Sequence, residues 1–60
     1  MFVKIILPDN QIKIHYGVEL CITSPKAKRV IMGDIDVTSN CLSNGVIFIP
    51  SVTEDVVIHY

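Results

Sequence analysis

The chain has 60 residues, of which 50% are hydrophobic and 18% are charged, and its formal net charge is −1. This length allows one small domain, residues 1–60, and excludes most enzymes, because a catalytic site with its supporting residues normally needs a larger scaffold. Isoleucine and valine together account for 18 of the 60 residues. Because β-branched side chains pack well on a pleated sheet and lose rotamer freedom in helices, the composition predicts an all-β protein.

The first predicted strand covers Met1 to Leu7 and ends in a turn at Pro8-Asp9-Asn10, where proline supplies the φ of a type I turn. From Gln11 to Thr23, every even position is apolar and most odd positions are polar. This alternation predicts one long strand with a single apolar face. A strand of this length must bend in a small domain, and Gly17 at its midpoint is the expected bend; a tight hairpin at Gly17 is the alternative.

The middle of the chain contains a loop and a third strand. Ser24 to Lys28 carries the turn residues of a loop, and the strand is predicted from Arg29 to Thr38. The alternation is irregular around Gly33, which predicts a bulge there. Beyond the bulge, Ile35 and Val37 are expected to face the core.

The last third of the chain has a clear hairpin signal. Asn44-Gly45 is typical of a type I′ turn, because both residues tolerate positive φ. The following strand is predicted from Val46 to Ile49, where Pro50 stops it. Ser51 to Glu54 is expected to form one turn of 3₁₀ helix, and Val56 to Tyr60 is the last strand.

Together these elements predict a small antiparallel five-stranded barrel or a strongly bent sheet. The segment Gly45 to Ser51 resembles the end of SH3 domains, which implies an SH3-like shape. The aromatic residues with which SH3 domains grip proline-rich peptides have no counterpart here, so the resemblance implies nothing about function. The last strand has two alternatives: it pairs with the first strand and closes the barrel, or it lies at an open sheet edge.

No cofactor or metal is expected. The residue types that bind zinc occur four times, at His15, Cys21, Cys41 and His59. No two of them stand two to four residues apart, as structural zinc sites usually require. Asp34 and Asp36 are predicted to share one strand face, as a hydrated acidic edge rather than a catalytic pair. The two cysteines are expected to be reduced thiols.

No apolar run exceeds the four residues of Val46 to Ile49, which excludes a transmembrane helix. Pro8 ends the apolar start of the chain too early for a signal peptide, so a cytoplasmic location and no membrane partner are expected.

The residues Lys26, Lys28 and Arg29 form the one basic cluster, and Lys4 and Lys13 extend it if the first two strands pair. Such a loop can contact phosphates. Base stacking is expected to be limited, because Tyr16 and one phenylalanine are predicted to face the core.

The residues Val57, His59 and Tyr60 belong to the apolar last strand. If this strand lies at an edge, its unpaired backbone is a template for a strand of another protein or of a second copy.

The first hypothesis is therefore a non-enzymatic protein-interaction module that binds a protein partner or itself, as a homodimer, through a sheet edge or an apolar face. An inhibitor, adaptor or assembly factor of a phage or mobile element suits so compact a chain. The alternative is a small nucleic-acid-binding regulator that uses the basic loop Lys26 to Arg29.

Overall fold

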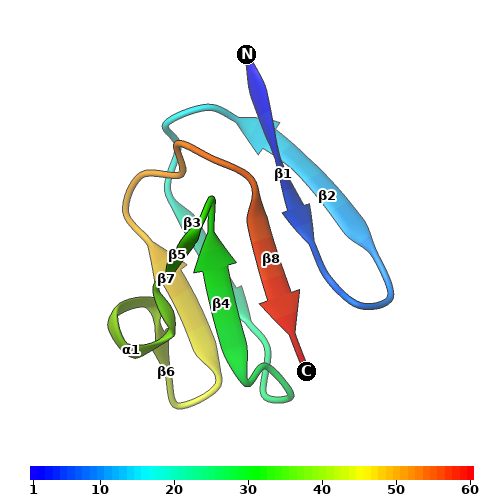
Figure 1. Ribbon diagram of the computed structural model, residues 1–60, viewed down its shortest axis with the longest axis vertical. Helices are drawn as coiled ribbons and strands as arrows, with labels where there is room; N and C mark the ends of the chain where they lie inside the picture. The colour runs from blue at the N-terminus through cyan, green and yellow to red at the C-terminus, as the bar shows by residue number, and fades with distance from the viewer.

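The computed structural model describes residues 1–60, which form eight short strands and one helical turn. The strands are arranged in two sheets, with the spatial orders β2-β1-β8-β4-β5 and β3-β7-β6. Figure 1 looks onto the five-stranded sheet, with β3 and β7 behind it. The all-β class predicted from composition is confirmed, whereas the two sheets do not close into the expected barrel. No helix in the structure is long and apolar enough to span a membrane.

The last strand lies in the middle of the larger sheet. In spatial order the strands of this sheet are β2 (Gln11–His15), β1 (Phe2–Ile6), β8 (Val56–His59), β4 (Arg29–Met32) and β5 (Ile35–Asp36). β8 pairs in parallel with β1 and antiparallel with β4. The pairing of the first and last strands is confirmed, but it does not close a barrel. The edge position of β8 and the wholly antiparallel arrangement are wrong.

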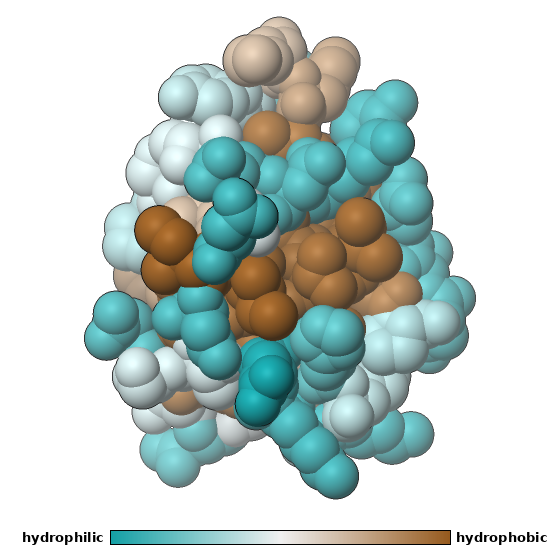
Figure 2. All heavy atoms as spheres, viewed as in Figure 1, coloured by the Kyte–Doolittle hydropathy of each residue, from teal (hydrophilic) through white to brown (hydrophobic).

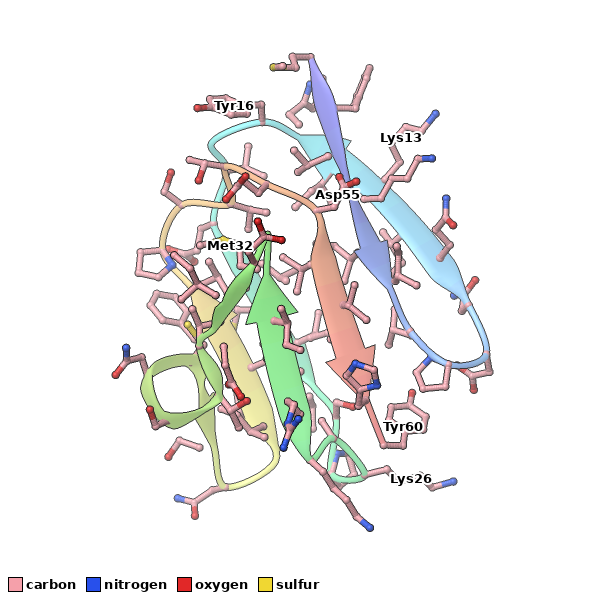
Figure 3. The ribbon with its side chains drawn as sticks, in the orientation of Figure 1. Lys13, Tyr16, Lys26, Met32, Asp55 and Tyr60 are labelled. Carbon is pink, nitrogen blue, oxygen red and sulfur yellow. The ribbon has the colours of Figure 1, made fainter.

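A side chain extends the short parallel pairing of β1 and β8. The ladder contains only Ile5 opposite Val56 and Ile6 opposite Val57. Directly before it, the backbone N–H of Lys4 donates to Oδ1 of Asp55 at 2.9 Å. Figure 3 shows Asp55 between β1 and β8. The carboxylate thus satisfies a strand donor that no backbone carbonyl reaches.

The smaller sheet consists of β3 (Leu20–Thr23), β7 (Val46–Ile49) and β6 (Leu42–Ser43). The single helical turn α1 (Thr38–Cys41) precedes β6. Asn44 and Gly45 join β6 to β7 with φ angles of 52° and 77°, as a type I′ turn requires. This hairpin and the bounds of β7 are confirmed.

The long strand predicted from Gln11 to Thr23 is two strands that belong to different sheets. The break falls at Gly17, whose φ of +83° changes the direction of the chain. The position of the bend is confirmed and the continuity of the strand is wrong. In Figure 1, β2 extends beyond the smaller sheet. On the predicted apolar face, Ile14 packs against the core, whereas Ile12 and Tyr16 are exposed.

The bulge predicted at Gly33 is instead a two-residue turn. Gly33 and Asp34 join β4 to β5, with Met32 opposite Ile35, and the φ of Gly33 is +62°. Because β5 is a two-residue edge strand, Ile35 is 63% exposed rather than buried. Val37 is buried, as predicted.

The helical turn predicted from Ser51 to Glu54 is absent. Instead, Val52 is fully buried and exchanges two backbone hydrogen bonds with the chain at Gly17 and Val18, at 2.7 and 2.9 Å. Val52 thus anchors this segment to the chain at Gly17 and Val18, and the segment contains bends rather than a helical turn.

One cluster of buried aliphatic side chains lies between the sheets. Its members are Val3, Ile5, Leu20, Val30, Val37, Ile47, Ile49, Val52, Val56 and Ile58. Both sheets contribute to it, and the opposite face of the larger sheet is left free for other contacts.

Candidate functional site

The candidate site is the face of the five-stranded sheet that points away from the core, here called the outer face. One residue from each strand lines up across it, in the order Gln11, Ile6, Val57, Ile31 and Asp36. The three aliphatic members of this line, Ile6, Val57 and Ile31, are here called the outer row. They are half-buried, although none of them belongs to the core cluster between the sheets.

Charged and polar side chains surround the outer row. Figure 2 shows apolar side chains gathered in the middle of this face and hydrophilic ones around them. By strand register, the surrounding residues are Lys4, Lys13, Arg29, Asp36 and His59. An apolar centre within a polar rim of both charges is typical of a surface that contacts another protein.

The structure joins two groups of residues that the sequence analysis treated as separate sites. Arg29, from the basic cluster, lies directly opposite His59 on the last strand. The backbone N–H of Lys28 donates to the carbonyl of His59 at 2.7 Å. Figure 3 shows Lys26 and Tyr60 at this same end of the molecule. Arg29, Val57 and His59 therefore belong to the outer face, whereas Lys26 and Lys28 lie in the loop before β4 and Tyr60 follows the end of β8.

At the end of β5, hydrogen bonds and an ion pair hold the carboxylate of Asp36 in place in the polar rim. Asp36 accepts hydrogen bonds from the hydroxyl of Thr38 at 2.6 Å and from its backbone N–H at 2.9 Å. Nε of Arg29 lies 3.7 Å from Oδ2 of the same carboxylate. The two hydrogen bonds from Thr38, aided by the Arg29 charge, lower the pKa of Asp36. Arg29 is thus partly neutralised, whereas Lys26 and Lys28 form no ion pair.

A second cationic group lies at the other end of the outer face. β1 and β2 pair, and they place Lys4 directly opposite Lys13 without a carboxylate in ion-pair distance of either. The next pair is Phe2 and His15, whose ring centroids are 4.6 Å apart. Nζ of Lys13 lies 5.9 Å from the centroid of the Phe2 ring. This end combines positive charge with an exposed aromatic ring.

The other candidate chemistries are not assembled. Nowhere do three or more His, Cys, Asp or Glu side chains gather as metal ligands, and the surface has no pocket. Cys21 and Cys41 are free thiols. The predicted face shared by Asp34 and Asp36 is wrong, because Asp34 lies in the turn before β5.

The aromatic side chains are more exposed than the sequence predicts. Tyr16 was expected in the core with one phenylalanine, yet all four aromatic residues are at least 41% exposed. Phe2 and Phe48 belong to β1 and β7, whereas Tyr16 and Tyr60 follow the ends of β2 and β8, and none of the four belongs to the buried cluster between the sheets.

The sequence analysis missed Ile6 and Ile31. The available signal was the doublets Ile5-Ile6 and Val30-Ile31 and the run Val56 to Ile58, which interrupt period-two alternation. In each doublet one residue is buried in the core and the other is in the outer row, and in the run Val57 of the outer row lies between two buried residues. Consecutive aliphatic residues in a strand thus indicate a second apolar face.

No family model matches this chain, and no significant match exists among curated proteins or solved structures.

Proposed function

We propose that this chain is a non-enzymatic, cytoplasmic protein-interaction module that binds a partner protein through the outer face. The observation that carries the proposal is the outer row, three aliphatic side chains in register at the centre of a solvent-facing sheet. These side chains lose their remaining contact with water only when another surface covers them, and that burial provides a driving force for association.

The rim supports the same proposal. It carries both signs of charge: Arg29 forms an ion pair with Asp36, whereas the side chains of Lys4 and Lys13 form none. A partner with acidic groups around an apolar patch complements this arrangement, and the charges set its orientation and association rate. Such a surface suits an inhibitor, adaptor or assembly factor of a phage or mobile element.

A charge placed in the outer row tests the proposal. Val57→Glu inserts a carboxylate between Ile6 and Ile31, on the solvent side of β8. The matched control is Ser43→Glu, which adds the same charge at an exposed position of the smaller sheet. Both variants are checked for folding by circular dichroism and are then compared with the wild type in pull-downs from cell extract, followed by calorimetry with the purified partner.

We expect Val57→Glu to weaken binding of the purified partner by about tenfold or more, as for a central interface residue. Ser43→Glu is expected to bind like the wild type. Retention of the same partner with unchanged affinity by Val57→Glu overturns the proposal, as does recovery of nucleic acid as the sole bound macromolecule.

The alternative, a small nucleic-acid-binding regulator, is supported by a different observation. Lys26 and Lys28 are exposed and unpaired, and they lie at the same end as Tyr60, which is 41% exposed and free to stack on a base. Alanine at Lys26, Lys28 and Arg29 is then expected to abolish binding of a labelled oligonucleotide. Wild-type affinity is expected to fall with salt, with a log–log slope of roughly −2 to −3 for three phosphate contacts. Binding without a salt dependence refutes this alternative.

A further inference from the structure

The backbone of β3 has an unpaired edge. β3 pairs with β7 and with no other strand. The N–H of Ser24 donates to the carbonyl of Gly45 at 2.6 Å, which continues the register Thr23 opposite Val46. Because hydrogen-bonded and non-hydrogen-bonded pairs alternate, Leu20 and Ile22 bond to β7 and the backbone groups of Cys21 and Thr23 point outward.

The alternation of inward and outward backbone groups extends to Val18 and Glu19, which precede β3. The carbonyl of Val18 accepts the N–H of Val52 at 2.9 Å, so Val18 bonds inward like Leu20. The backbone of Glu19 therefore points outward with that of Cys21 and Thr23. Three residues spaced two apart present free donors and acceptors along one edge.

The other sheet edges are less suited to pairing. β5 and β6 contain two residues each. β2 is longer, but Lys13 lies at its centre and its backbone points outward. Two copies of β2 paired about that centre place one lysine directly opposite the other, which is destabilising. β3 contains no charged residue between its ends.

We infer that two copies of this chain associate through β3, paired antiparallel about Cys21 and continuing the smaller sheet across the dimer axis. In this register Cys21 is opposite Cys21 of the second copy, and Glu19 is opposite Thr23 of the second copy. The three outward residues of each copy then exchange backbone hydrogen bonds in pairs, and no two like charges are opposed.

The side chains beside the edge favour a second copy as the occupant. Phe48 lies opposite Cys21 on the outward side of the smaller sheet and is 43% exposed. The dimer sets the two Cys21 side chains between two Phe48 rings, in one row across the joined sheet. Each copy thus contributes half of an apolar strip that is interrupted at the edge of a single copy.

The first test is the dissociation constant of the wild type and of two charge variants at one position. Light scattering after size exclusion, over a range of concentrations, is expected to give twice the chain mass of 6.7 kDa at the upper end. Thr23→Glu opposes Glu19 of the second copy twice and is expected to weaken the dimer by about fivefold. Thr23→Lys pairs with the same glutamate and is expected to strengthen it by about the same factor. Lys13→Glu, at the edge of β2, is the control that leaves the constant unchanged.

The second test uses the thiol at the predicted axis. With Cys41→Ser, a short bis-maleimide is expected to join Cys21 to Cys21, because residues in such a pair have their Cα atoms about 5.5 Å apart. Cys21→Ser, which keeps Cys41, is expected to remain uncrosslinked.

Three results overturn the inference: a monomer at every concentration, a dimer whose constant is the same for Thr23→Glu and Thr23→Lys, and cross-linking through Cys41. A dimer that Val57→Glu dissociates also overturns it, since self-association then uses the outer face. Loss of a partner protein with Val57→Glu, while the dimer persists, shows that the two surfaces act independently.

Discussion

Ile58 and Val57 are neighbours in β8 that point to opposite faces of the sheet. Truncating each of them in turn compares the contribution of the core to stability with that of the outer face. Ile58 is 1% exposed and belongs to the buried cluster, whereas Val57 is half-buried on the outer face. Ile58→Ala removes a fully covered side chain and leaves a cavity, which costs about 2–5 kcal/mol. Val57→Ala removes two methyl groups that water partly reaches, so the loss is about 1 kcal/mol or less.

The two losses in unfolding free energy differ in how they compare with the total stability of the chain. At about 0.05–0.15 kcal/mol per residue, a domain of this size is stable by roughly 3–9 kcal/mol. Ile58→Ala therefore removes much of the free energy of unfolding, and Val57→Ala leaves most of it. Urea titrations followed by far-ultraviolet circular dichroism suit a chain without tryptophan.

With a slope near 1 kcal/mol per molar urea, the midpoint is expected to fall by about 2 M or more for Ile58→Ala and by at most about 1 M for Val57→Ala. Equal shifts refute the assignment of the two faces. A larger shift for Val57→Ala shows that the outer row is covered in the isolated chain.

Three further perturbations test other parts of the structure. Leu20→Asp is expected to unfold the chain, because it buries an unpaired charge, whereas Lys13→Asp is expected to leave it folded; circular dichroism that is alike for both variants contradicts the inward face assigned to β3. The lowered pKa of Asp36 means that its stabilising contribution is present above the unfolded-state pKa and is lost as the pH falls through the folded-state pKa, in acid below about pH 4. In an NMR titration, Thr38→Ala is expected to move the pKa of Asp36 up toward its usual value, and an unmoved pKa rules out the hydroxyl as its main cause. Gly33→Ala is expected to cost about 1–2 kcal/mol in a urea titration, because a side chain is strained at a φ of +62°, and an unchanged midpoint contradicts the turn.

Local chemistry explains which parts of the fold the sequence predicts. Asn44-Gly45 encodes a tight turn by itself, since positive φ at both positions needs no tertiary partner, and the adjoining strand follows at the correct bounds. The role of Gly33 is less determined, because a glycine of positive φ occurs both in bulges and in hairpins. The choice depends on whether Ile35 returns alongside Met32, which local alternation does not specify.

In the candidate site, too, the sequence predicts what depends on local residues and not what depends on strand pairing. Sequence reasoning identified Arg29 and His59, but it placed them in separate sites because their proximity depends on the pairing of β4 with β8. It also left open whether the last strand pairs with the first strand or lies at an edge, since an uncharged aliphatic strand has the same composition at an edge and at the centre of a sheet. Partner choice among strands depends on the burial of the whole chain, and Asp55, which completes the contact of β8 with β1, gives no signal of that role in its neighbours.

The central position of β8 also determines how the chain must fold. β1 with β2 and β4 with β5 are hairpins that close over short loops, yet they belong to one sheet only after β8 inserts between them. The contact of β1 with β8 joins residues about fifty positions apart, so most of the chain must lose its freedom before this contact forms. Such non-local topology slows folding relative to other chains of this length. Until β8 inserts, both hairpins have exposed strand edges, and in this partly folded state the chain is most open to mispairing and proteolysis.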